Sequence, residues 1–541
     1  TVYLRTEQDT LKFALFCTES LGIRRVASHD SPIRLPELPL HDPQSGEANY
    51  HNIATYAAIE GRSVKIDDAY AAQDFDFSGT KAFDQRNGYR SCSIFTVPLI
   101  NQASRVIGVL QLINAIDEDS GEVIAFPQES CDYVEALASQ AAVALDNRML
   151  VQAQSNLLES FIQMIASSID AKSPYTGGHC ARVPEIVELL TDAVCQESAG
   201  THATFSMTEA ERYELKIAAW LHDCGKLVTP THIMDKATKL ERIFDRIEVV
   251  SQRIGRAKIE QELQWTRAQL EGLCDSETGA SRIQEAHARL DTHLEFIRRV
   301  NLGGERLSQD DIDTIHQISH EFVEGDVGST PLLTDDEVYN LTVSRGTLTP
   351  EERLTINGHM AETVRMLESL PFPGHLRRVP EYACGHHERM DGTGYPRGLY
   401  AGDMSVPARI VAIADVFEAL TASDRPYKSG KTLSESLSIM ASMKQGNHLD
   451  PELFDIFVRS KSYLRYAETR LRPEQLDEVN EEAILATSAD PMDLPERGVR
   501  DARWRRLLPE YQRRLDRNRR VPIGHESTKP SRRSGGFKPV S

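Results

Sequence analysis

Residues 386–396, HHERMDGTGYP, constrain the fold of this chain more than any other feature. Two adjacent histidines are followed by acids and by a glycine-rich turn that ends in Tyr-Pro. Two more segments carry related side chains: residues 222–226 (HDCGK) upstream, and Asp415 downstream within an apolar run. Imidazole nitrogens and carboxylate oxygens are the donors that divalent transition metals prefer. A fold that brings these three segments together would form a metal centre.

The apolar surroundings of the acids strengthen this interpretation. Leu215 and Ala219 share a helical face with His222, so this histidine is expected to point inward. A buried carboxylate, as expected for Asp223 and Asp415, is costly unless it is paired or bound to a metal. Each segment alone has an ordinary explanation: a core histidine, a salt-bridged aspartate or an exposed pair of loop histidines. The three together favour the metal centre.

Length and composition define the class of protein. With 541 residues the chain exceeds a single core, and two or more domains are expected. The net charge of −20 argues against non-specific DNA binding by the body of the protein. No apolar run approaches the roughly 18 residues of a membrane span. Eight cysteines without a C-x-x-C pair favour reduced thiols and a cytoplasmic protein.

Residues 1–148 are expected to form an α+β domain. Apolar runs predict strands at 11–16, 94–100 and 106–112, and a polar loop of hairpin length joins the last two. A helical pattern rich in Ala and Leu follows from Ser130. Since the sequence begins with Thr1 and not with Met, we expect it to start inside this domain.

Residues 149–170 are expected to form a connecting helix. Apolar residues recur at spacings of three and four, which predicts one continuous helix from about 137 to 170. A helix between two domains can form the seam of a parallel dimer, and an amphipathic helix packed on its own domain is the alternative. The apolar stripe consists of Leu145, Met149, Leu157, Leu158, Phe161 and Ile165.

Residues 171–460 carry the metal-ligating motifs and are expected to be helical. A polar stretch at about 240–340 interrupts them, with helical periodicity on both sides of a turn composition near 274–280. This pattern predicts an inserted hairpin of two antiparallel helices. Residues 461–541 are expected to be a helical and then basic tail whose last part is disordered.

The motifs resemble two known families. The NGYRSCS segment at 87–93 and VIGVLQLIN at 106–114 resemble GAF sensory domains, with the start of the domain missing. His222-Asp223 with Lys226 resembles the HD phosphohydrolase superfamily. Its HD-GYP branch, known as bacterial cyclic di-GMP phosphodiesterases, matches further segments: HHERMDGTGYP, LTPEERLTINGH (348–359), ADVFEALTASDRPYK (414–428) and HLDP (448–451).

This resemblance implies a multidomain architecture. We expect an α+β GAF sensory domain, a connecting helix and an all-α HD-GYP domain with an inserted helical hairpin. The family's metal ligands fall on His179, His222, Asp223, His359, His386, His387 and Asp415. This donor set suits Fe or Mn better than Mg or Ca. Some relatives have a Glu four residues before the first histidine, where this chain has Tyr175, so we expect two metals with Asp223 as their bridge.

The implied activity is signal-regulated hydrolysis of cyclic di-GMP to pGpG, GMP or both. Two cations that share a water lower its pKa. Asp223 and Lys226 are the candidate catalytic residues, with Lys226 reaching the phosphate to stabilise or protonate the leaving oxygen. A surface lysine is the plain alternative for Lys226. Tyr395, Arg425 and Lys428 would hold phosphates or guanines, although a polar loop also explains the last two.

The partners and alternatives follow from the same resemblance. The GAF domain would bind an unidentified small molecule, and the chain would form a homodimer. Glu388 and Asp391 are expected to orient metal ligands and not to bind metal themselves. Another cyclic nucleotide such as cyclic GMP-AMP is an alternative substrate. A receptor that binds the dinucleotide without hydrolysis is the alternative from a different class.

Overall fold

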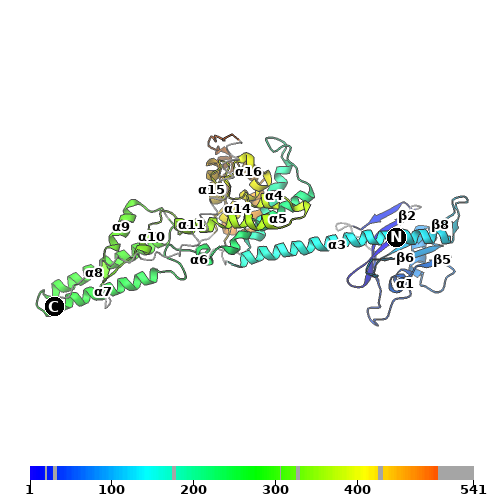
Figure 1. Ribbon diagram of the computed structural model, residues 1–541, viewed down its shortest axis with the longest axis horizontal. Helices are drawn as coiled ribbons and strands as arrows, with labels where there is room; N and C mark the ends of the chain where they lie inside the picture. Colours follow the sequence, from blue (N-terminus) through cyan, green and yellow to red (C-terminus); the bar gives the residue numbers. More distant parts are fainter. Residues whose placement is uncertain are drawn as a thin grey trace, which may run out of the picture. The chain divides into compact units, whose positions relative to one another are not determined.

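The structure is a computed structural model that describes residues 1–18, 21–27, 33, 35–172, 178–304, 306–323, 329–423 and 430–496. Its contacts divide the chain into two compact units, Thr1–Leu158 and Glu159–Ser541. The N-terminal unit combines a sheet with helices, and the C-terminal unit is built almost wholly from helices (Figure 1). The α+β and helical classes expected from the sequence are therefore confirmed at this level.

The N-terminal unit is built on a seven-stranded antiparallel sheet of order β3-β2-β1-β7-β6-β5, with β4 beside β2. Its two longest neighbouring strands, β6 and β7, pair across residues 101–105, as the sequence predicts. A separate two-stranded ribbon pairs β8 (Ala115–Ile116) with β9 (Val123–Ile124). The strands of the main sheet are β1 (Val2–Arg5), β2 (Thr10–Thr18), β3 (Ile23–Val26), β4 (Leu38–Pro39), β5 (Val64–Ile66), β6 (Ile94–Ile100) and β7 (Val106–Ile113).

Helices cover both faces of this sheet, which explains why β6 is buried along most of its length. Alternate side chains of a strand point to opposite faces. Phe95, Val97 and Leu99 pack against the N-terminal half of α3 (Gln128–Lys172). Ile94, on the other face, joins a cluster with Ile53 of α1 (Ile53–Glu60), close to the start of α2 (Ser78–Asn87).

Helix α3 is continuous from Gln128 to Lys172, in agreement with the predicted long helix. Within its middle section, Leu157 is 57% exposed and Phe161 is 50% exposed. Other apolar side chains exposed along this section are Met149, Leu150, Val151 and Met164. Ile162 and Ile169 are buried, so the last turns of α3 pack into the C-terminal unit.

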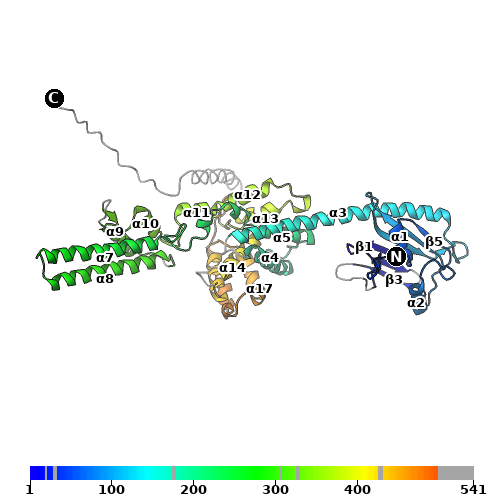
Figure 2. The ribbon, with the colours of Figure 1, turned by 90° about the horizontal axis from the view of Figure 1, so that it is seen from below.

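The metal-ligating motifs of the C-terminal unit lie among packed helices. Helix α4 contacts α5, α14, α16 and α17 (Figures 1 and 2). Phe417, Phe457 and Tyr466 form a buried aromatic cluster between three of these helices. The helices are α4 (His179–Gln196), α5 (Glu209–Leu221), α12 (His359–Ser369), α13 (Val379–Ala383), α14 (Val406–Thr421), α15 (Leu433–Gln445), α16 (Pro451–Arg459), α17 (Ser462–Arg470) and α18 (Glu481–Ala486).

Local capping signals explain where several helices begin. A capping box between Thr208 and Glu211 starts α5, as predicted. Thr349 caps α11 (Pro350–Asn357), with Pro350 in its first turn, also as predicted. The unit also contains short helical segments: α6 (Thr231–Met234), η2 (Cys224–Val228), η3 (Gly374–Leu376), η4 (Ala401–Asp403) and η5 (Pro473–Gln475).

The stretch at 240–340 contains more than two helices. Helices α7 (Ile247–Leu270) and α8 (Ser276–Asn301) lie side by side in both views (Figures 1 and 2). They share a hydrophobic cluster with α9 (Gln309–Ser319) and α10 (Asp335–Leu341). Leu333 of this cluster follows the two-stranded ribbon of β10 (Phe322–Val323) and β11 (Thr330–Pro331). This cluster includes Leu240, Ile254, Leu290, Ile297, Ile315 and Leu333. The stretch therefore has a small core of its own.

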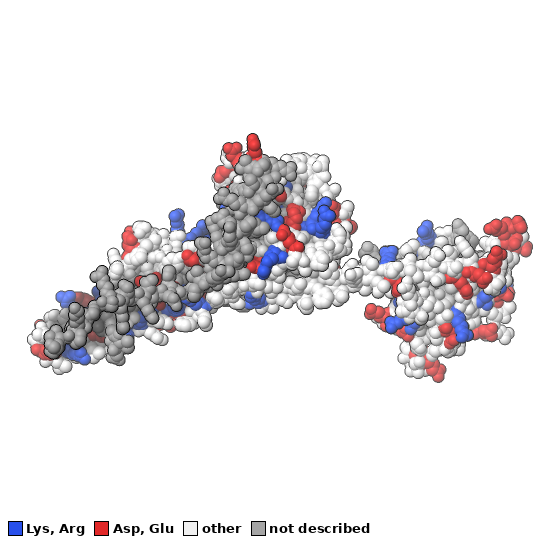
Figure 3. Space-filling model, viewed as in Figure 1, with Lys and Arg blue, Asp and Glu red and all other residues white. Residues whose placement is uncertain are grey.

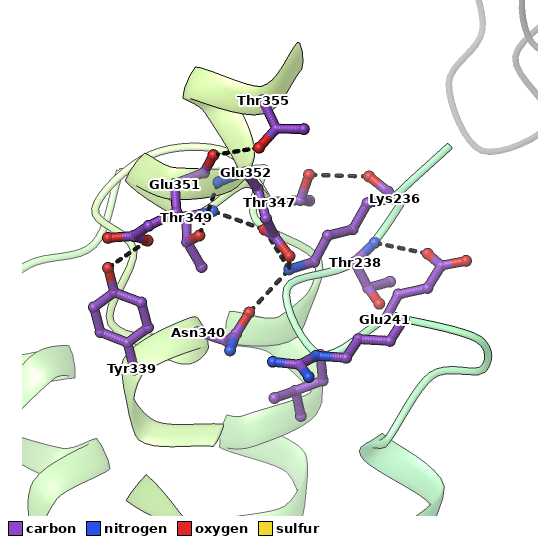
Figure 4. A network of polar contacts seen from close by, with 12 residues as sticks. Lys236, Thr238, Glu241, Tyr339, Asn340, Thr347, Thr349, Glu351, Glu352 and Thr355 are labelled. Carbon is purple, nitrogen blue, oxygen red and sulfur yellow. Dashed lines mark hydrogen bonds and ion pairs between the residues drawn. The ribbon is translucent and has the colours of Figure 1, made fainter. Parts of the chain in front are cut away.

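A buried polar network joins this stretch to α11 (Figure 4). Lys236 Nζ donates to Asn340 Oδ1 at 2.9 Å and to the two carboxylate oxygens of Glu352 at 2.9 and 2.8 Å. Glu352 also accepts from the backbone N–H of Thr349 at 2.9 Å. The Lys236 side chain is fully buried and that of Glu352 is 6% exposed. Each charge therefore depends on the other for its compensation.

Among the described residues, no helix is both long enough and apolar enough to cross a bilayer. On the face drawn in Figure 3, acidic and basic side chains of the described residues are interspersed.

Lys236→Met is expected to destabilise the C-terminal unit by ~3–5 kcal/mol, because it leaves the buried charge of Glu352 uncompensated. Urea unfolding followed by circular dichroism measures this loss. The matched control is Arg256→Met, which removes an exposed Arg256–Glu260 pair and should cost ~0–1 kcal/mol. Equal effects of the two substitutions would contradict the role of the Lys236 network.

Candidate metal centre

Helix ends bring most of the predicted ligands together. His179 and His359 are the first residues of α4 and α12, and His222 is the C-terminal cap of α5. Asp223 precedes η2 directly, and His386 and His387 follow shortly after α13. Asp415 lies inside α14, where the apolar run places it. Chain turns at helix ends allow side chains from distant segments to converge.

The seven side chains form two groups. The first is His359, His386 and His387, and the second is His179, His222, Asp223 and Asp415. Within each group, the potential ligand atoms all lie within 4.8 Å of one another. The structure thus brings together all seven residues that the sequence singled out.

Asp223 lies between the two groups. Its Oδ2 is 3.4 Å from Nε2 of His179 and 3.4 Å from Nε2 of His222. Its Oδ1 is 3.3 Å from Nε2 of His359 and 3.9 Å from Nε2 of His386. One carboxylate oxygen therefore faces each group, which is the arrangement that a bridging ligand requires.

Backbone carbonyls fix the orientation of three imidazoles. Nδ1 of His222, His359 and His386 each lies 2.7 Å from the carbonyl oxygen three residues earlier in the chain. If Nδ1–H donates there, Nε2 is left as the free acceptor and points into the cluster. Such outer hydrogen bonds set the tautomer and orientation of metal-binding histidines.

His179 is held by a carboxylate instead. Its Nδ1 contacts Glu418 Oε2, and Glu418 is 1% exposed. Arg182 Nε donates to the other oxygen of Glu418 at 2.6 Å. Glu418 was not among the predicted site residues, although the sequence carries a signal for it: it is a second acid, three residues after Asp415, in the same apolar helix.

Buried nitrogen and oxygen atoms without a hydrogen bond indicate whether this cluster fits a cation. Asp223 Oδ1, His359 Nε2 and His386 Nε2 are buried and make no hydrogen bond to any described residue. Buried polar atoms without partners are rare in folded proteins. Burial, followed by the neighbouring His222, lowers the pKa of His386 to about 4. A neutral ring is the form that binds metal, so the donor set fits divalent cations.

Lys226 faces the same cluster. Its Nζ contacts Asp223 Oδ2, and its side chain is 23% exposed. Burial lowers the pKa of Lys226, but Asp223 and Asp415 more than offset this and raise the pKa above its usual value. Burial raises the pKa of Asp223, but Lys226 and His222 outweigh it and hold this pKa well below its usual range. Lys226 is therefore a stable cation beside a carboxylate anion.

Gly225 allows η2 to approach α12 closely. A Cβ atom at this position would lie 1.9 Å from the carbonyl oxygen of His359 and 2.6 Å from the backbone nitrogen of Thr363. The backbone N–H of Gly225 donates to Thr363 Oγ1 at 2.9 Å. This contact brings Asp223 within reach of His359, so the glycine of HDCGK has a packing role.

The glycine-rich turn places Tyr395 against the cluster. The rings of Tyr395 and His387 are stacked, with centroids 4.9 Å apart and 19° between their planes. Glu388 accepts from the backbone N–H groups of Arg397 at 2.7 Å and Leu399 at 2.9 Å. Glu388, which we expected to orient metal ligands, thus shapes this loop. Asp391 accepts from Thr393 N–H at 2.9 Å within the same loop.

Three residues of the sequence analysis lie outside the described residues. They are Tyr175, at the position of a third-metal ligand, and the candidate substrate-binding residues Arg425 and Lys428. The basic tail with Arg503, Arg505 and Arg506 also lies outside them.

Two family profiles match the chain. The GAF domain profile matches residues 8–145, and the HD domain profile matches residues 333–453. The HD match includes His359, His386, His387 and Asp415 and ends within α16. His179, His222 and Asp223 lie outside it, so their assignment rests on the motifs and on the geometry described above.

Curated relatives are cyclic dinucleotide phosphodiesterases. The 3'3'-cGAMP-specific phosphodiesterase 1 of Vibrio cholerae serotype O1 is 42% identical over 21% of this chain and 26% of its own length. The 3'3'-cGAMP-specific phosphodiesterase 3 of the same organism is 24% identical over 77% of this chain and 68% of its own length. A cyclic di-GMP phosphodiesterase of Thermotoga maritima is 40% identical over 21% of this chain and 30% of its length. The chain thus spans only part of these relatives.

A solved structure gives a weaker likeness. A cyclic GMP-AMP-specific phosphodiesterase of V. cholerae aligns at 12% identity with a TM-score of 0.27, over 66% of this chain and 59% of that chain. A score this low does not establish a shared overall fold. The comparisons thus place a GAF domain at residues 8–145 and an HD domain at residues 333–453, and the curated relatives that the chain resembles are cyclic dinucleotide phosphodiesterases.

Gly225→Ala is expected to lower metal binding strongly, because the new methyl group must push η2 away from α12. Metal content after reconstitution, measured by elemental analysis, tests this. Gly255→Ala in α7 is the matched control, since its Cβ would have no atom within 4 Å. Retention of full metal content in the Gly225 variant would contradict the packing argument.

Glu418→Gln is expected to weaken metal affinity about 10–100-fold, the usual effect of removing an outer partner of a metal-binding histidine. Titration with Mn²⁺ followed by a competing chelator measures it. Glu435→Gln, on an exposed turn of α15, serves as the control. Unchanged affinity in Glu418→Gln would show that His179 does not need this carboxylate.

Proposed function

We propose that the chain is a metal-dependent phosphodiesterase that hydrolyses a cyclic dinucleotide under control of its GAF domain. One observation carries the proposal: Asp223 lies between two groups of potential metal ligands, and three buried ligand atoms there make no hydrogen bond to a described residue. The names of the relatives support the same reaction class. A full set of seven donors argues against a receptor that has lost catalysis.

The proposed cofactors are two divalent transition metals, Fe or Mn. His359, His386 and His387 would hold one, and His179, His222 and Asp415 the other, with Asp223 shared. Five imidazoles among seven donors favour such ions over Mg or Ca. When bound, these cations would stabilise negative charge on the phosphate and lower the pKa of water.

The chain's own residues would orient the substrate. Lys226 keeps its proton because its pKa is raised, and its ammonium group can donate to the leaving oxygen of the scissile phosphate. Asp223 holds this ammonium group at the cluster. We propose that Tyr395, with Arg425 and Lys428, contacts the phosphates or guanines. The stacking of Tyr395 on His387 supports its place beside the substrate.

Cyclic di-GMP is the leading substrate, with pGpG, GMP or both as products. A second candidate is 3'3'-cGAMP, because a relative aligned over 77% of this chain is named as specific for it. The two differ only in one purine base. The residues that distinguish the two substrates would therefore contact the edge of a base and not the metals.

Asp223→Asn is expected to reduce hydrolysis of both dinucleotides to background, because the shared carboxylate charge is lost. Protein purified without oxygen and loaded with Mn²⁺ or Fe²⁺ is incubated with each dinucleotide, and products are separated by chromatography. Chelator treatment should abolish turnover in the parent. Asp291→Asn on α8, with its exposed carboxylate, is the control. A metal-loaded parent that binds but cleaves neither dinucleotide would favour the receptor alternative.

We propose the domain boundaries that the sequence predicts. A GAF domain occupies 1–148, a signalling helix 149–170 and the HD-GYP domain 171–460, with a C-terminal segment at 461–541. We propose that 240–340 is an insertion into the HD-GYP domain. Its separate hydrophobic cluster supports this, and none of the candidate metal ligands lies within it.

We further propose a homodimer through α3. Leu157 and Phe161 are half exposed or more and are spaced four residues apart, as in a helical seam. Leu157→Glu with Phe161→Glu is expected to convert the dimer to a monomer in sedimentation velocity. Gln152→Glu, also on the exposed part of α3, is the control. A parent that sediments as a monomer at micromolar concentrations would contradict the proposal.

A further inference from the structure

The last turn of α3 contacts two segments that carry candidate site residues. Lys172, the final residue of α3, donates from Nζ to the carbonyl oxygens of Lys226 at 2.9 Å and Thr229 at 2.7 Å, and also to that of Leu227. Two residues earlier, Asp170 Oδ1 accepts from the backbone N–H of Cys180 at 3.2 Å. One turn of the connecting helix therefore contacts both η2 and the start of α4.

The number of carbonyl acceptors around Lys172 equals the number of N–H donors on its ammonium group. An ammonium group has three N–H donors, and here three carbonyl oxygens accept from it. These carbonyls lie at and just after the end of η2, and that of Lys226 also accepts from the backbone N–H of Thr229 at 3.1 Å. Hydrogen bonds from a charged donor are stronger than neutral ones. Lys172 thus anchors the end of the segment that begins after Asp223 and contains Lys226.

The contact of Asp170 involves the segment that carries His179. Cys180 follows His179 directly and is fully buried in the first turn of α4. Backbone N–H groups in a first turn have no partner within their helix, and a carboxylate is favourable there. Ile162, Ala166 and Ile169 are buried on the same side of α3 and hold this turn in place.

We propose that Lys172 and Asp170 are positioning residues of the hydrolytic site, so that displacement of the last turn of α3 moves Lys226 and His179 and changes turnover. The inference rests on the proposed function for its catalytic consequence. Its structural part is independent, because it concerns contacts of the polypeptide itself. It identifies the atoms through which the connecting helix would act on the site.

The first test is Lys172→Met in the full chain. Hydrogen exchange of the backbone amides in 224–229 should be faster by about ten-fold or more, because three charge-assisted bonds to this segment are lost. With metal loaded, kcat should fall about 10–100-fold while KM and metal content stay near those of the parent. Arg148→Met is the matched control, since it removes the same charge from an exposed position on α3.

The second test separates positioning from general stability. Asp170→Ala removes the acceptor for Cys180 N–H, whereas Asp170→Asn keeps a carbonyl oxygen that can accept. Asp170→Ala should lower kcat and metal affinity, and Asp170→Asn should restore most of both. The same melting temperature in the two variants, alongside different kcat values, would support positioning.

Two results would overturn the proposal. One is exchange of 224–229 in Lys172→Met that matches the parent. The other is an unchanged kcat in both Lys172→Met and Asp170→Ala. A parent that hydrolyses no cyclic dinucleotide, while Lys172→Met still speeds hydrogen exchange of 224–229, would contradict the proposed function but support the contact between α3 and this segment.

Discussion

The burial of the Asp223 carboxylate is the constraint on which the C-terminal unit depends. Asp223 is 1% exposed, and a carboxylate that deep must be compensated by cations or by polar groups. Four imidazoles and the ammonium group of Lys226 lie around it. They come from the starts of α4 and α12, from the segment that spans the end of α5 and η2, and from the turn after α13, so the packing of these segments determines how this charge is compensated.

Several local features position the groups that surround the Asp223 carboxylate. Gly225 lets η2 approach the backbone of α12, which sets the separation between Asp223 and His359. Carbonyls three residues earlier orient three histidines, and Glu418 orients His179. The end of α3 then contacts the two segments that carry Lys226 and His179. If α3 transmits a change from the GAF domain, as we propose, these contacts are where it would act on the site.

Much of the site could be predicted from the sequence because its residues occur in contiguous motifs. All seven proposed ligands converge in two groups, as the motifs indicate. The strand pair β6–β7 and the capping boxes of α5 and α11 were also predictable, since they depend on local patterns. Glu418 could also have been predicted, because it is a second acid in the apolar helix that contains Asp415.

Other features have no sequence signature. Lys172 binds backbone carbonyls more than fifty residues away, and any residue type can present such a carbonyl. The core shared by α7, α8, α9 and α10 arises from tertiary packing of several short apolar patterns, so the predicted pair of helices was only part of it. The roles of Arg425 and Lys428 stay predictions.

Anomalous diffraction from crystals of the Mn- or Fe-loaded protein tests the central claim most directly. Data collected on both sides of the metal absorption edge locate each ion without assuming its ligands. The account predicts two peaks, one beside His359, His386 and His387 and one beside His179, His222 and Asp415, with Asp223 between them. A single peak, or peaks that do not contact Asp223, would contradict it.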